Sequence, residues 1–137
     1  MAFEKVGLTH TFQASTGLRQ YQAVALTGAN NRLINPTTEG NCVGILVSSG
    51  TTGSTGRAGS TDSGSVQTVQ LAGIAKVIAG TTTIVASNLI KAATDGRAST
   101  SSSTSYRFGL SLGAVDSTST SAHVVSVLLS PSYQHFL

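Results

Sequence analysis

The single cysteine of the chain lies in a pattern that resembles the turn around a catalytic nucleophile. Residues 40–44, GNCVG, fit the pattern G-x-C-x-G, in which the nucleophile sits on a sharp turn between a strand and a helix. Here the chain continues as ILV (residues 45–47), which is a strand sequence, and no helical pattern follows. Cys42 is therefore interpreted as a small buried apolar residue. One cysteine also excludes a disulfide within the chain.

The other residues that could do acid–base, metal or phosphate chemistry are scattered. None of the histidines is spaced with a second ligand as metal sites require, and each aspartate lies in a loop or turn sequence, where its side chain usually bonds the backbone. The glycine-rich stretch 50–60 lacks the Gly-Lys-Ser/Thr that opens the helix of a phosphate-binding loop. The residues concerned are His10, His123, His135, Asp62, Asp95 and Asp116. The sequence therefore predicts no enzyme, no cofactor and no metal site.

The charge pattern argues against nucleic acid as a partner. The chain carries eight basic and five acidic residues, a net charge of +3, and the basic residues never cluster. Binding to nucleic acid needs a dense basic stripe or aromatic stacking platforms. Charged residues make up only 9% of the chain, well below the usual quarter. Because solubility of a free monomer normally rests on charged surface, this composition suggests a chain that works inside an assembly.

Targeting signals are not evident. Residues 1–12, MAFEKVGLTHTF, contain no apolar run that could serve as a signal peptide, and no apolar stretch is long enough to cross a membrane. We therefore expect synthesis in a host cytoplasm, and a final location there or in a particle that leaves the cell, such as a virion.

Apolar residues at two-residue spacing predict a single all-β domain. The expected strands cover residues 20–26, 32–34, 42–47, 66–78, 81–85, 89–92, 107–114 and 123–129. The expected loops are 48–65, 99–105 and 116–121, which are rich in Ser, Thr and Gly. Asp95-Gly96 is the strongest turn signal, because both residues tolerate positive φ.

Some expectations concern which face a residue occupies. The run 42–47 is uniformly apolar, which predicts a central strand buried on both faces. Gly73 lies in the middle of 66–78, where it predicts a bulge or a close approach of another backbone. In the later strands the inward residues are expected to be Phe108, Leu110, Leu112 and Ala114, with Arg107, Gly109 and Ser111 outward, and then Val125, Val127 and Leu129 on one face.

Both ends of the chain suggest contacts with other molecules. The apolar residues of 1–19 fit neither the spacing of a helix nor that of a strand. We expect this segment to form either a frayed terminus or an extended arm on a neighbouring subunit. For the arm, the expected contact residues are Phe3, Val6, Leu8 and Phe12. The C-terminal residues Tyr133, His135 and Phe136 are expected to contact another subunit, and an ordinary cap on the end of the β domain is the alternative.

The order of several short segments resembles a known family. The matching residues are Val69, Leu71, Gly73, Ile74 and Ala75, then Ala79 and Gly80, then Asp95, Gly96, Arg97 and Ala98, followed by the segments 107–116 and 123–130. This order is similar to that of the small decoration, or cement, proteins of tailed-phage heads. The resemblance covers residues 20 to 130, and its signal lies in order and spacing rather than in one motif.

The resemblance implies a compact β-barrel or β-sandwich. From the residues themselves, outside the range of the resemblance, we expect residues 1–19 to form an extended N-terminal arm and residues 20–137 to form the β domain. The resemblance also implies a homotrimer on the outer surface of the head, which binds the major capsid protein and stabilises contacts between its copies, without direct nucleic-acid or membrane contact. The alternative is a receptor- or glycan-binding β module of a phage fibre or head fibre. Loop 48–65 contains no aromatic residue and one acid, which disfavours that alternative because such sites usually present aromatic or acidic side chains.

Overall fold

The computed structural model of the chain shows an all-β protein. It describes residues 5–15, 17–27, 31–36, 42–48, 66–80, 83–101, 107–115 and 123–129. Within these ranges there are eleven strands and no helix, so the prediction of an all-β fold built from short strands is confirmed. Accordingly, no helix in the described part of the chain is long and apolar enough to cross a membrane.

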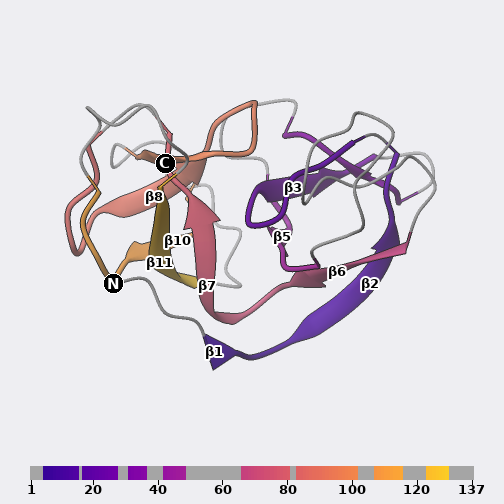
Figure 1. Ribbon diagram of the computed structural model, residues 1–137, viewed down its shortest axis with the longest axis horizontal. Helices are drawn as coiled ribbons and strands as arrows, with labels where there is room; N and C mark the ends of the chain where they lie inside the picture. The colour runs from indigo at the N-terminus through magenta and orange to yellow at the C-terminus, as the bar shows by residue number, and fades with distance from the viewer. Residues whose placement is uncertain are drawn as a thin grey trace.

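The strands form two antiparallel sheets that lie side by side as two lobes (Figure 1). The six-stranded sheet has the order β1 (Lys5–Val6), β7 (Gly73–Ile78), β11 (Val124–Leu129), β10 (Gly109–Ser111), β8 (Leu89–Ala92) and β9 (Ala98–Thr100). The five-stranded sheet has the order β2 (Thr9–Gln13), β6 (Val66–Gln70), β5 (Gly44–Leu46), β3 (Ala23–Leu26) and β4 (Leu33–Ile34).

One continuous ladder joins the two sheets. β1 pairs with β7, with Val6 opposite Gly73, and β2 pairs with β6, with Thr9 opposite Gln70. The register is the same in both pairs, so residues 5–13 run as one extended edge strand along both sheets (Figure 1). This segment belongs to the N-terminal arm of the sequence prediction. It is extended, and it pairs with strands of its own chain.

Both strands of this ladder pass from one sheet to the other at the same place, between β1 and β2 and between β6 and β7. The N–H of Gly7 donates to the carbonyl of Ala72 (3.3 Å), and the N–H of Leu71 donates to the carbonyl of Leu8 (2.7 Å). Gly73 follows with φ of 97°, a value that favours glycine. The prediction of one strand over 66–78 with a bulge at Gly73 is therefore wrong: β6 and β7 are two strands in different sheets, and Gly73 begins the second.

Two apolar clusters fill the interior, and β3 and β5 contribute to both. Ala23 and Ile45 lie in the larger cluster, which also contains the inward residues of β7, β8 and β11. Val24 and Leu46 lie in the smaller cluster, together with buried residues of β4 and β6. All three residues of β5 are buried, and β5 lies between β6 and β3. The prediction of a central strand buried on both faces is confirmed.

The later strands confirm one predicted facing and overturn another. In β11, Val125, Val127 and Leu129 are buried, as expected. Phe108 is buried as predicted, whereas Ala114 is exposed rather than inward. In β10 itself Gly109 and Ser111 are buried while Leu110 is partly exposed, which is the reverse of the predicted facing. The reason is close packing against β11: a side chain on Gly109 would meet the carbonyl of Leu128 and a methyl group of Val127.

Smaller differences concern where strands begin. The first predicted strand, 20–26, is shortened to β3, and Tyr21 lies before it with φ of 67°, outside the β region. Of the segment 81–85, Ile84 makes a single bridge to Val115. The predicted loop 99–105 begins inside β9.

Candidate interaction surface

The turn at Asp95-Gly96 connects β8 to β9 and docks onto β3. The N–H of Ala23 donates to the carbonyl of Gly96 (2.7 Å). Asp95 Oδ1 accepts from the N–H of Arg97 (3.1 Å), and its other oxygen lies 3.4 Å from the guanidinium Nε of Arg97. Asp95 thus bonds its own turn, as predicted for aspartates of this chain. The ion pair is exposed, so its contribution to stability is small.

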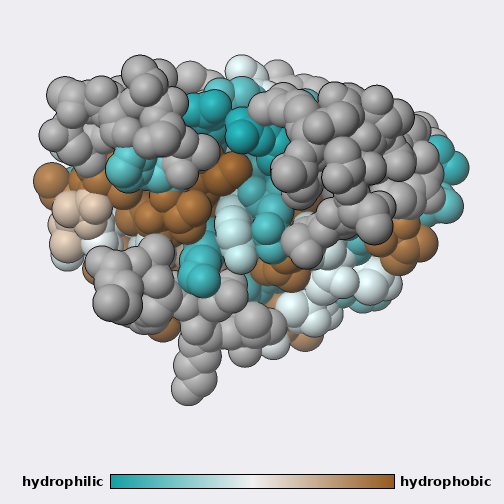
Figure 2. Space-filling view, in the orientation of Figure 1, coloured by the Kyte–Doolittle hydropathy of each residue, from teal (hydrophilic) through white to brown (hydrophobic). Residues whose placement is uncertain are grey.

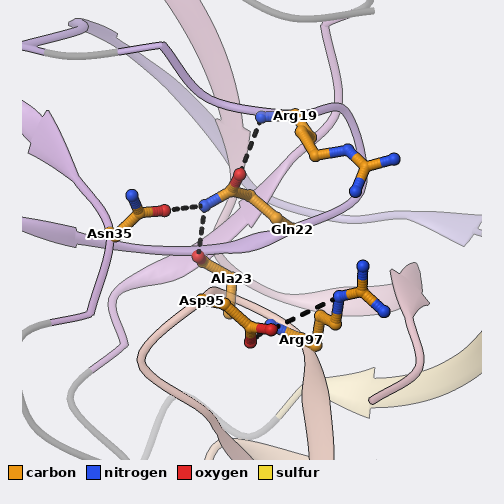
Figure 3. Close-up of polar contacts among 6 residues, drawn as sticks. All are labelled: Arg19, Gln22, Ala23, Asn35, Asp95 and Arg97. Carbon is orange, nitrogen blue, oxygen red and sulfur yellow. Dashed lines mark hydrogen bonds and ion pairs between the residues drawn. The ribbon is translucent and has the colours of Figure 1, made fainter. Parts of the chain in front are cut away.

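Gln22 is the buried polar residue behind this turn (Figure 3). Its Oε1 accepts from the N–H of Arg19 (2.7 Å), and its Nε2 donates to Oδ1 of Asn35 (2.6 Å) and to the carbonyl of Ala23 (3.4 Å). A buried amide is favourable only when it is bonded in this way. Gly96 lies directly against Gln22, where a larger residue would not fit. The arrangement joins the two sheets and supplies no reactive group.

Cys42 is the other group that the sequence offered as a reactive site. Its side chain is buried, and Sγ donates to the carbonyl of Gly44 (3.3 Å). Burial raises the pKa of the thiol from 9.0 to about 12, because the thiolate would lose its hydration. A protonated, enclosed thiol is a poor nucleophile, so the interpretation of Cys42 as a small buried apolar residue is confirmed.

The remaining candidates for chemistry are apart from one another. His10 lies on β2 and His123 precedes β11, both exposed, while His135, Asp62 and Asp116 are outside the described residues. Among the residues that the structure describes, no group of three His, Cys, Asp or Glu side chains could hold a metal ion.

The most open surface is the free edge of residues 5–12. β1 and β2 are the outermost strands of their sheets, and no described strand pairs with their second edge. Past residue 12 this edge is partly closed, since the N–H of Ser15, just after β2, donates to Leu33 in β4, and at the other sheet the N–H of Gly80 donates to Ala98 in β9 (2.8 Å each). β2, with the sequence THTFQ, carries no charge, proline or bulge of the kind that protects exposed edges.

Backbone directions along β2 follow from its neighbours. The N–H of Val47 donates to the carbonyl of Thr68, so the backbone groups of Thr68 face β5. Thr11 lies opposite Thr68, and in an antiparallel ladder its own N–H and carbonyl must then point away from β6. Thr11 therefore presents an N–H and a carbonyl on the open edge.

The predicted contact residues of the N-terminal arm divide between this edge and the interior. Leu8 is 61% exposed at the join between β1 and β2. Phe12 is half-buried, packs against the smaller apolar cluster, and stacks edge-on with His10 at 4.8 Å between ring centroids. Val6 lies in β1, and Phe3 is outside the described residues. No pattern in the sequence singles out Thr11, because an edge position follows from non-local pairing.

The predicted C-terminal contacts, Tyr133, His135 and Phe136, are outside the described residues. The structure adds an exposed residue just before them, since Leu128 is 44% exposed on β11. Figure 2 shows that apolar residues gather over the lobe of the six-stranded sheet on the face in view.

The fold and these surfaces define a two-sheet β module with one free edge strand. No protein-family model matches the chain, and no curated protein matches it. Among solved structures, the chain is similar to the N base of head fibre gp8.5 of bacteriophage phi29, with a TM-score of 0.62, 18% sequence identity, and coverage of 94% of this chain and 98% of that chain. At this identity the comparison shows a shared fold over nearly the whole of both chains.

Proposed function

We propose that this protein is a structural component of a tailed-phage head, which attaches to the outer surface of the capsid through contacts with the major capsid protein. The observation that carries the proposal is the shared fold with a head-fibre base over nearly the full length of both chains. The order of segments that resembles head decoration proteins supports the same location independently. We take the protein to be a decoration protein that also associates with itself, as the resemblance implies.

The contact with the capsid lies, in this proposal, on the free edge of residues 5–12. Leu8 supplies exposed apolar surface, and Thr11 supplies backbone hydrogen-bonding groups. Val6 belongs to the same edge, Phe12 supports it from inside, and Phe3 precedes it. Many weak contacts of this kind act together on a repeating lattice, so that avidity replaces one strong interface.

Stabilisation would follow from mass action. A protein that binds the expanded lattice and not its precursor adds its binding free energy to the expanded state. No bond is made or broken in this mechanism, and it uses surface complementarity alone.

The second candidate is a base that attaches a head fibre. Its support is that the similar structure is the base of a head fibre. The two roles differ in their effect on the capsid: a decoration protein raises resistance to heat or osmotic shock, whereas a fibre base leaves the resistance of the shell unchanged.

The first experiment mixes the purified protein with expanded heads that lack it and with unexpanded proheads of the same phage. Saturable binding to expanded heads is the expected result, followed by greater resistance of the heads to osmotic shock. Absence of binding to either particle contradicts the proposal. Binding without added resistance favours the fibre base.

Variants then test the edge. Thr11→Pro removes an N–H that points away from β6, so the ladder and the melting temperature should be preserved, while head binding should weaken about tenfold or more. Leu8→Ser should act in the same direction. Val85→Ser is the matched control, because Val85 is 50% exposed and lies away from this edge. Deleting residues 1–14 is a poorer test, since it also removes the buried Ala14.

A further inference from the structure

Four aliphatic side chains form a row across four neighbouring strands of the six-stranded sheet. Ile74 in β7 lies opposite Leu128 in β11, Leu128 lies opposite Leu110 in β10, and Leu110 lies opposite Leu89 in β8. Directly paired residues of neighbouring strands share one face of a sheet, so these four, here called the outer row, form a continuous line.

The outer row points away from the core. The residues next to it in sequence, Ala75, Val127 and Ile90, are buried in the larger apolar cluster, and successive side chains of a strand point to opposite faces. Leu128 is 44% exposed, and the other three members are partly exposed. An aliphatic line of this kind on an outer face marks an interaction surface.

The length and width of the outer row indicate what kind of partner could bind there. Four strands at a spacing of about 4.8 Å give a row of about 15 Å that is one side chain wide. Two globular partners usually bury about 800 Å² each, which a single row does not supply. An extended segment of about five residues, at about 3.3 Å per residue, matches its length.

The residues that follow β11 have the chemistry for this role. Ser130 to Leu137, SPSYQHFL, contain Tyr133, Phe136 and Leu137 and no Asp, Glu, Lys or Arg. These residues lie outside the described ranges, and β11 ends at Leu129, beside the outer row. Aromatic side chains without Asp, Glu, Lys or Arg among them suit an uncharged aliphatic row, because no charged side chain must give up its hydration when the two meet.

We infer that the outer row binds the C-terminal segment, residues 130–137, of a second copy of the chain. This rests on the self-association in the proposed function, and it names the surface that mediates it. A second copy fits better than the same chain for a steric reason. Proline at 131 disfavours a helical turn at Ser130, so a chain leaving Leu129 continues past the row, and it would have to reverse direction to cover it.

Disulfide trapping tests the inference directly. Cys42 is the single native cysteine and is buried, so introduced cysteines carry the reactive thiols. The Leu128→Cys and Phe136→Cys variants carry tags of different mass, and they are mixed under mild oxidation. The expected product is a disulfide between the two tagged chains. A mixture of Val85→Cys and Phe136→Cys is the matched control and should give no such product.

Two results would overturn the inference. One is the absence of the mixed disulfide. The other is a disulfide that forms solely within a chain carrying both L128C and F136C, which would show that each segment covers its own row.

Self-association provides an independent measurement. Light scattering over a dilution series should show that Leu110→Ser with Leu128→Ser weakens association about thirtyfold or more, from the apolar area that these side chains bury on binding. Leu8→Ser is the control and should leave association unchanged, and thermal melting should show that all variants are folded.

The outcomes separate this inference from the proposed function. A protein that is monomeric at every concentration removes self-association and the inference together, while head binding is measured separately. An oligomer that the outer-row substitutions leave intact removes the inference alone.

Discussion

Substitution of Gly96 by alanine should destabilise the protein more than its position in an exposed turn suggests. Gly96 has φ of 81°, where any other residue is strained by about 1 kcal/mol. A Cβ at this position would lie 2.5 Å from Nε2 of Gln22 and 2.8 Å from the carbonyl of Ala23. The amide can rotate away, but the backbone carbonyl cannot, so the turn must withdraw from β3.

That withdrawal breaks contacts between the sheets. It lengthens the bond from the N–H of Ala23 to the carbonyl of Gly96, now 2.7 Å, and it disturbs the buried side chain of Gln22. A net loss of about 1 kcal/mol is typical for each hydrogen bond. With the backbone strain, Gly96→Ala should cost about 3 kcal/mol, or about 10 °C in melting temperature for a chain of this size.

Urea unfolding followed by circular dichroism measures the effect, and the midpoint should fall by about 1 M or more. Gly113→Ala is the matched control: its Cβ would have as nearest neighbour a methyl of Val125 at 4.0 Å, so its midpoint should stay within about 0.3 M of the parent. If Gly96→Ala and Gly113→Ala unfold at the same urea concentration, the turn does not dock on β3 as described.

Two further measurements test the interior. Burial raises the pKa of the Cys42 thiol from 9.0 to about 12. The stability that the protonated, buried thiol contributes is therefore complete below pH 9 and is lost as the pH rises towards 12, because over this range the thiol ionises in the unfolded chain and stays protonated in the folded one. Urea titrations at about pH 8 and pH 10 give the free energy of unfolding at each pH. Between these pH values it should fall by about 1 kcal/mol more in the parent than in Cys42→Ala, and an equal fall in both proteins contradicts the burial. Val127→Ala should cost about 2 kcal/mol and Leu128→Ala less than about 1 kcal/mol, because the first side chain is fully buried and the second is 44% exposed. Equal losses of unfolding free energy in this pair would contradict the assigned facing of β11.

The sequence predicts strands well where apolar and polar residues alternate or where an apolar run is short. The buried strand β5 and the alternation of β11 follow from these patterns, because each residue's burial depends on its own side chain. The turn at Asp95-Gly96 is predictable for a similar reason, since its backbone conformation is available to few residue types.

Changes of sheet are not visible in the same patterns. The two-residue period continues from β6 into β7, although Val69 points into one apolar cluster and Val77 into the other. Only the pairing partners differ, and they lie far away in sequence. The facing of β10 fails for a related reason: Gly109 has no side chain to show that it points inward, and its small size matters because β11 packs against it.

The candidate surfaces depend on the same non-local information. From the sequence, Leu8 and Phe12 look alike as apolar residues in a polar segment. In the structure Phe12 packs against the smaller cluster, whereas Leu8 lies at the join between β1 and β2 and is exposed. The outer row is likewise invisible until the register places Leu110 opposite Leu128.

The open edge is best explained by its contrast with the other sheet edges. An unprotected edge strand promotes uncontrolled association unless another strand, a charge or a bulge covers it. In the described structure β4 and β9 are each partly covered by a backbone bond from their own chain, so the fold has the means to cover its edges. Among the described residues, no strand pairs with the outer edge of residues 5–12, which lie along both lobes. An edge that spans the whole module can fix the orientation of both sheets against a partner at once, which a loop contact on one lobe cannot do.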